Sequence, residues 1–131
     1  MQDRRTHRSN TPQEAGRLFL QSLVARHGLE ALVLSNEDGL LMLGATSPAG
    51  ASLNLDWIGA VGCVCSLPGR RGAPLGALVE RATGGQPLEA AELMVRGERL
   101  YLAAVGGHLP PGPEVVAGIE RILARSLPAA A

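Results

Sequence analysis

The stretch LVLSNEDGLLMLG, from Leu32 to Gly44, places two apolar runs on either side of a four-residue polar break. The break, Asn36 to Gly39, predicts a type I turn in which Asn36 accepts local backbone hydrogen bonds and Gly39 takes a positive φ. Its carboxylates lack the spacing of an EF-hand, so it does not predict a calcium site. The stretch therefore predicts a β-hairpin with strands over 29–35 and 40–46.

Neither of these strands alternates cleanly between apolar and polar residues, since Leu32, Val33 and Leu34 are consecutive. A strand that is apolar on both sides is buried on both faces of its sheet. Helices must then cover both faces, which predicts a three-layer α/β/α arrangement.

A helix is expected before the hairpin. The sequence TPQE begins it, with Thr11 as the cap, Pro12 at the first position and Glu14 closing a capping box, and Gly28 ends it. The expected apolar face consists of Phe19, Leu20, Leu23 and Val24. The residues expected to face away are Arg17, Gln21 and Arg26.

After the hairpin, Asn54 or Asp56 could cap a helix over 54–67. The alternative is a strand over 57–67, because Val and Cys tolerate strands; a helix is favoured because a strand would leave one sheet face poorly covered. Pro68-Gly69 must break or kink the helix, and a second piece resumes at Pro74.

A second hairpin is predicted over 88–107, with Gly97-Glu98 as a type II′ turn. The segment HLPPGP cannot lie inside a sheet, and Pro113 opens a last helix. The fold class is α/β, in the order α-β-β-α-β-β-α, with a mostly antiparallel sheet of four or five strands. One domain over 11–127 is expected, between a disordered basic tail over 1–10 and a short tail over 128–131.

The composition argues against several classes of function. The net charge is zero and the chain has three aromatic residues, which does not suit nucleic-acid binding. No leader or membrane span is apparent, so a cytoplasmic protein is expected. The histidines lie at no spacing typical of a triad or metal site, so no catalytic residue, metal or cofactor is predicted: His7, His27 and His108.

The helix over 54–67 is rich in small residues. Gly59 and Gly62 each cost about 1 kcal/mol there relative to Ala, and they permit another backbone to approach closely. We therefore expect a homodimer through this helix and a neighbouring strand edge. The expected interface consists of Trp57, Gly59, Ala60, Val61, Gly62, Cys63 and Val64. Cys63 and Cys65 form no redox or zinc motif and are expected to be packing residues.

Arg70 and Arg71 lie in the break that follows this helix, within PGRRGAP. One interpretation is a solvated loop. The functional interpretation is an exposed basic contact for a protein partner, because paired guanidiniums bind carboxylates well.

The order of elements resembles the roadblock/dynein light chain family. The resemblance covers about 13–127 and is carried by LEALVLSNEDGLLMLGAT (29–46), the small-residue helix, the hairpin AELMVRGERLYLAAV (91–105) and the closing helix. The bacterial gliding-polarity regulators of the MglB and MglC type are similar. The family usually has three strands before the last helix, whereas two are clear here.

The resemblance implies a roadblock-like (profilin/longin-like) fold and a non-enzymatic dimeric adaptor in a bacterial cytoplasm. Its partners would be itself and a small Ras-like GTPase or another roadblock protein, in cell polarity or motility. The alternative function is a small-ligand sensor domain of the PAS-like α/β type, which the sequence opposes because few polar groups converge inward.

Overall fold

The computed structural model describes residues 12–66 and 79–126, and its elements follow the expected order. A 3-10 turn, η1 (Pro48–Gly50), follows the first hairpin, and residues 79–83 are helical. The stretch over 57–66 is a helix rather than a strand. The main elements are α2 (Pro12–His27), β1 (Ala31–Ser35), β2 (Leu41–Thr46), α3 (Leu55–Ser66), β3 (Leu88–Val95), β4 (Glu98–Val105) and α5 (Gly112–Ser126).

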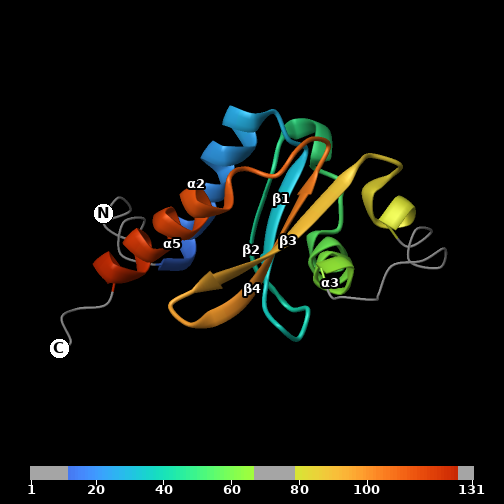
Figure 1. Ribbon diagram of the computed structural model, residues 1–131. Helices are drawn as coiled ribbons and strands as arrows, with labels where there is room; N and C mark the ends of the chain where they lie inside the picture. Colours follow the sequence, from blue (N-terminus) through green and yellow to red (C-terminus); the bar gives the residue numbers. More distant parts are fainter. Residues whose placement is uncertain (1–11, 67–78, 127–131) are drawn as a thin grey trace, which may run out of the picture.

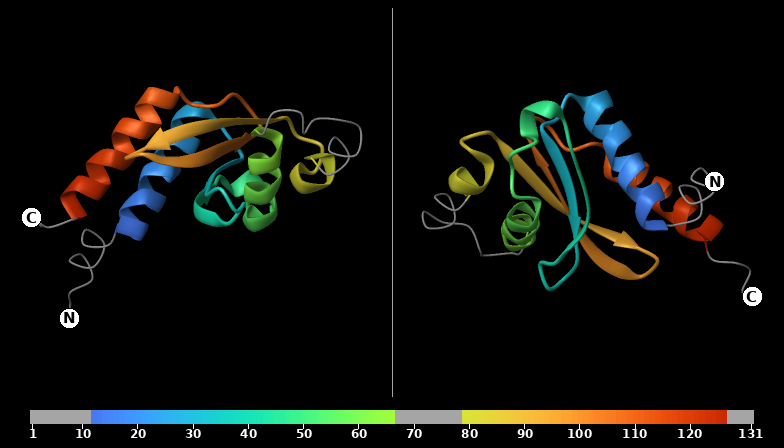
Figure 2. Two further views of the ribbon diagram at one scale, coloured as in Figure 1. Left: turned by 60° about the horizontal axis from the view of Figure 1, so that its bottom comes forward. Right: turned by 180° about the vertical axis from the view of Figure 1, so that it is seen from behind.

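The four strands form one antiparallel sheet in the order β2-β1-β4-β3. Figures 1 and 2 show α2 and α5 side by side on one face of this sheet and α3 on the other. The expected three-layer α/β/α architecture is confirmed. Every residue of β1 is buried, as its uninterrupted apolar run predicts for a strand covered on both faces.

Each face of the sheet has its own apolar core, because successive side chains of a strand point to opposite sides. Leu32 and Leu34 of β1 pack with α2 and α5, together with residues such as Leu20, Leu102 and Val115. On the other face, Ala31 and Val33 pack against α3; this core also contains Ile58, Val61, Ala82, Ala103 and Val105.

Local signals set the ends of these elements as expected. Gly28 follows α2 with φ +65°. In the first hairpin, the Asn36 side-chain oxygen accepts the N–H groups of Asp38 and Leu40, and Gly39 has φ +79°. Asn54, rather than Asp56, caps α3, because its side chain accepts the Trp57 N–H at 3.1 Å. The expected cap Thr11 lies outside the described residues.

The turn of the second hairpin differs from the prediction. Val95 is opposite Glu98, so the turn residues are Arg96 and Gly97, with φ of +53° and +82°. Two positive φ values define a type I′ turn, and the predicted II′ turn at Gly97-Glu98 is wrong. The register explains the difference: shifting it by one residue would turn Leu93 out of the core of α2 and α5.

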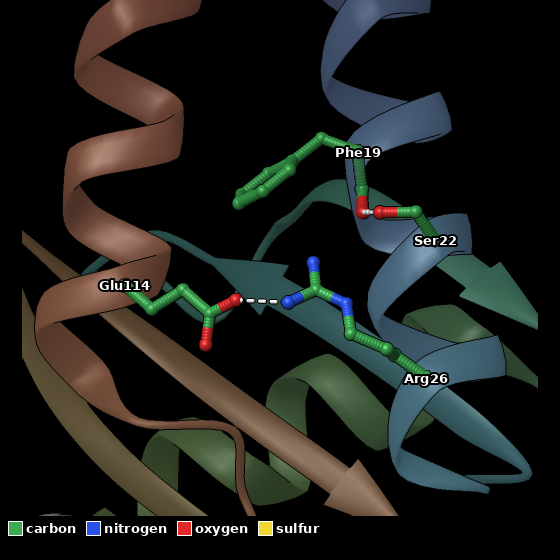
Figure 3. A network of polar contacts seen from close by, with 4 residues as sticks. All are labelled: Phe19, Ser22, Arg26 and Glu114. Atoms are coloured by element: carbon green, nitrogen blue, oxygen red, sulfur yellow. Dashed lines mark hydrogen bonds and ion pairs between the residues drawn. The ribbon is translucent and has the colours of Figure 1, made fainter.

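Helices α2 and α5 run antiparallel and are in direct contact. Arg26 near the end of α2 forms an ion pair with Glu114 at the start of α5 (Figure 3). The Phe19 ring reaches Gly118, where an added Cβ would lie 2.1 Å from the ring carbon Cζ. Arg26 points away from the apolar face of α2, as expected, and its exposed guanidinium bridges the two helices at the surface.

Candidate interaction surface

One side of α3 is buried against the sheet of the same chain. Ile58 is fully buried and Val61 is 5% exposed. A Cβ added to Gly62 would lie 2.7 Å from the Cβ of Ala103, and one added to Gly59 would lie 3.3 Å from Val33. The small residues that predicted a close neighbour therefore have one inside the chain, in strands β1 and β4.

The other side of α3 carries an apolar stripe, which we call the outer stripe: Trp57, Ala60 and Val64. Their spacing of three and four residues places them on one helix face. Trp57 and Ala60 are half-buried, and Val64 is 37% exposed. The expected interface is thus divided by the fold. Trp57 also packs against the core beneath α3, and Val64 is exposed. The buried members of the expected interface face the sheet or the first turn of the same chain: Gly59, Val61, Gly62 and Cys63.

The first hairpin turn lies beside the middle of α3. Gly39 approaches Ala60, and the Cys63 thiol contacts the Glu37 carbonyl at 3.8 Å. Burial raises the pKa of the Cys63 thiol, and the nearby charge of Asp38 raises it further. A buried thiol that stays protonated is a poor nucleophile, so Cys63 acts as the packing residue that its sequence context predicted. The side chain of Cys65 lies outside the described residues.

Strand β3 lies at one end of the sheet and is in contact with α3. Within 12–66 and 79–126, β3 pairs with β4 alone, so it is an edge strand of eight residues. Ala90 packs in the core beneath α3, and Met94, on the same strand face, is 52% exposed. Met94 therefore lies on the sheet face that α3 covers. We call the outer stripe and the β3 edge together the candidate interaction surface.

The sequence reading missed a polar cluster at the start of β3. The carboxylate of Glu89 accepts the backbone N–H of Leu109 at 2.9 Å and contacts Nδ1 of His108 at 2.8 Å. These bonds lower the pKa of Glu89, the Leu109 N–H contributing most. The register of the second hairpin pairs Glu89 with Ala104, a few residues before the segment HLPPGP. A correct prediction of that register would have placed Glu89 near His108 and Leu109.

The remaining sequence predictions concern metal binding, a membrane span and a basic contact. No group of three or more His, Cys, Asp or Glu side chains in the described part of the chain is placed to hold a metal ion. None of the described helices is long and apolar enough to cross a membrane. Arg70 and Arg71 lie outside the described residues, so their role as a partner contact stays a prediction.

A pocket of about 680 Å³ lies on the opposite face, under the start of α2 and the end of α5. Its walls are mainly apolar and include Leu34, Leu100, Ile119 and Leu123. Gln13, Arg96 and Glu98 are its polar residues. Pockets of this size and lining can hold small molecules.

No protein-family model matches this chain, and no curated protein matches it in sequence. Among solved structures it is similar to the gliding protein MglB of Thermus thermophilus, with a TM-score of 0.55. That match has 12% sequence identity and covers 88% of this chain and 93% of the other. The likeness confirms the expected roadblock-like fold over most of the chain.

Proposed function

We propose that this protein is a non-enzymatic, roadblock-like adaptor or regulator of a bacterial cytoplasm. It binds itself and a small Ras-like GTPase, or another roadblock protein that regulates one, in cell polarity or motility. The proposal is supported by the fold, which resembles that of a gliding protein. The observation that carries it is the candidate interaction surface, which combines an apolar helix stripe with an edge strand.

Self-association is the first part of the proposal. An edge strand presents N–H and C=O groups that another strand can satisfy, and a long edge strand without a cover favours such pairing. The outer stripe would add apolar contacts between the two copies of α3. A contact of this kind is self-complementary, so it suits a two-fold dimer.

Partner binding is the second part, and Arg70 and Arg71 are the residues that we assign to it. Two adjacent guanidiniums can bind carboxylates of a partner through paired hydrogen bonds. Replacing both with Ala should weaken binding at least tenfold, or ~1.4 kcal/mol, while the dimer persists. Arg121→Ala, an exposed arginine on α5, is the matched control.

The experiment uses the whole protein as bait for the cytoplasm of its native cell. Any GTPase that is captured is purified, loaded with GDP or with a non-hydrolysable GTP analogue, and titrated by calorimetry. The proposal expects a small GTPase or a roadblock protein to bind the wild type and the Arg121→Ala control. Absence of both from the captured proteins would refute the proposed partner class.

A second candidate function, a small-ligand sensor, is favoured by one observation, the pocket of about 680 Å³. Native mass spectrometry of the protein purified without denaturant tests it. A sensor should carry a bound small molecule that Leu123→Trp, which fills the pocket, displaces. A ligand-free spectrum in both proteins would remove this candidate.

A further inference from the structure

The second edge of the sheet, β2, differs from β3 because side chains of a helix bond to its backbone carbonyls. Helix α2 lies along β2, as Figures 1 and 2 show. Gln13 donates its side-chain N–H to the Met42 carbonyl at 2.8 Å, and Gln21 donates to the Thr46 carbonyl at 2.9 Å. The sequence reading expected Gln21 to face away from the fold, and this contact shows that expectation to be wrong.

Both carbonyls point away from the sheet. The Ser47 N–H bonds to the Glu30 carbonyl, so Ser47 faces β1. In a trans peptide the carbonyl points opposite to the N–H of the next residue, so the Thr46 carbonyl faces outward. Leu43 pairs with Leu34 in the same register as Ser47 with Glu30, before the register shift at Ser35, so the Met42 carbonyl faces outward as well. The two glutamines therefore occupy positions at which a further strand would place its N–H groups.

The helix can reach these carbonyls because of a glycine between the two glutamines. A Cβ added to Gly16 would lie 2.7 Å from Cδ1 of Leu43 on β2. The Gly16 backbone therefore brings α2 close to this edge. Along β3, by contrast, no side chain of the described residues donates to an outward backbone carbonyl in this way.

We infer that Gln13 and Gln21 are edge caps that close β2 against strand addition and restrict self-association to β3. A sheet with two open edges adds copies without limit, whereas a sheet with one open edge stops at a pair. The limit to two copies rests on the proposed self-association, but the closure of β2 does not. Gln13 and Gln21 are thus specificity residues that select which surface a second copy can use.

The test is the double variant Gln13→Leu with Gln21→Leu, compared with wild type by light scattering over a range of concentrations. Gln86→Leu, at an exposed glutamine two residues before β3 and so at the opposite edge of the sheet from β2, controls for the added apolar surface. The double variant should gain further copies, reaching larger assemblies if wild type is a dimer and a dimer if wild type is a monomer. The Gln86→Leu control should keep the wild-type mass.

A folded double variant with the wild-type mass would overturn the inference. A monomeric wild type would refute the proposed dimer and leave the edge caps standing if the double variant dimerises. If the double variant does not fold, amide exchange in wild type decides. The side-chain amide protons of Gln13 and Gln21 should exchange several-fold more slowly than those of Gln86, and equal rates would overturn the inference.

Discussion

Gly62 is the residue of α3 whose added Cβ would come closest to the sheet, 2.7 Å from the Cβ of Ala103. Two effects oppose each other at this position. Ala is the better helix former by about 1 kcal/mol, but a clash in a packed core costs about 1–3 kcal/mol. The clash should prevail because the neighbouring atom belongs to a short side chain on a central strand, which cannot swing aside.

Gly62→Ala should therefore lower the free energy of unfolding by about 1 kcal/mol, as measured by urea denaturation. Ala103→Gly removes the clashing methyl group. The double variant should be more stable than the sum of the two single effects predicts. A Gly62→Ala protein that is more stable than wild type would show that α3 does not pack this closely on β4.

Glu89 gives the fold a pH dependence of known sign. Its pKa is lowered in the folded state, chiefly by the Leu109 N–H, so its carboxylate stabilises the fold above the ordinary pKa of glutamate. That contribution is lost as the pH falls through the lowered pKa. The Leu109 amide shift should therefore titrate in NMR spectra below the ordinary glutamate range, and Glu89→Gln should abolish this transition. A transition at the ordinary glutamate pKa would contradict the contact.

At the scale of elements, residues that act locally could be read from the sequence. Asn36 and Gly39 define the first turn, and Asn54 and Gly28 mark helix ends. Each of these residues acts locally, through its own φ angle or through a side-chain hydrogen bond to a backbone N–H a few residues away. The second turn could not be read this way. Gly97 suits either of two turns, and the choice depends on which strand face meets α2 and α5.

The type I′ turn places Arg96 at φ +53°, which is costly for a residue with a long side chain. Asn tolerates this conformation and is favoured in such turns. Arg96→Asn should raise the free energy of unfolding by about 0.5–1 kcal/mol in urea denaturation. The backbone N–H of residue 96 keeps its contact with Glu120 in either variant. Arg96→Val should have the opposite effect, because valine is β-branched. Equal stability of the two variants would contradict the type I′ turn.

In α3, the sequence predicts a close neighbour but does not identify it. Gly59 and Gly62 indicate that a neighbour packs closely, but the sequence does not say whether that neighbour is the chain's own sheet or a second molecule. In the fold the glycines face β1 and β4, and the side of α3 away from them carries the outer stripe. The distinction depends on how α3 is rotated about its axis, which the three-dimensional packing determines.

At the scale of the whole molecule, the two sides of the sheet have different roles in this account. Helices α2 and α5 cover one face and, through Gln13 and Gln21, the β2 edge. Helix α3 covers the other face, and the outer stripe and the β3 edge are the surface that we propose for partners. Self-association of the protein is therefore proposed through this one side.

The mass of the protein in solution tests that claim most directly. By size-exclusion chromatography with light scattering, wild type should have twice the chain mass of 13.6 kDa. Val64→Glu places a charge on the outer stripe and should give a monomer, because burying an unpaired carboxylate costs several kcal/mol. Leu18→Glu, at an apolar residue of α2 that is 44% exposed, should remain dimeric. A monomeric wild type, or a Val64→Glu protein that stays dimeric, would contradict the account.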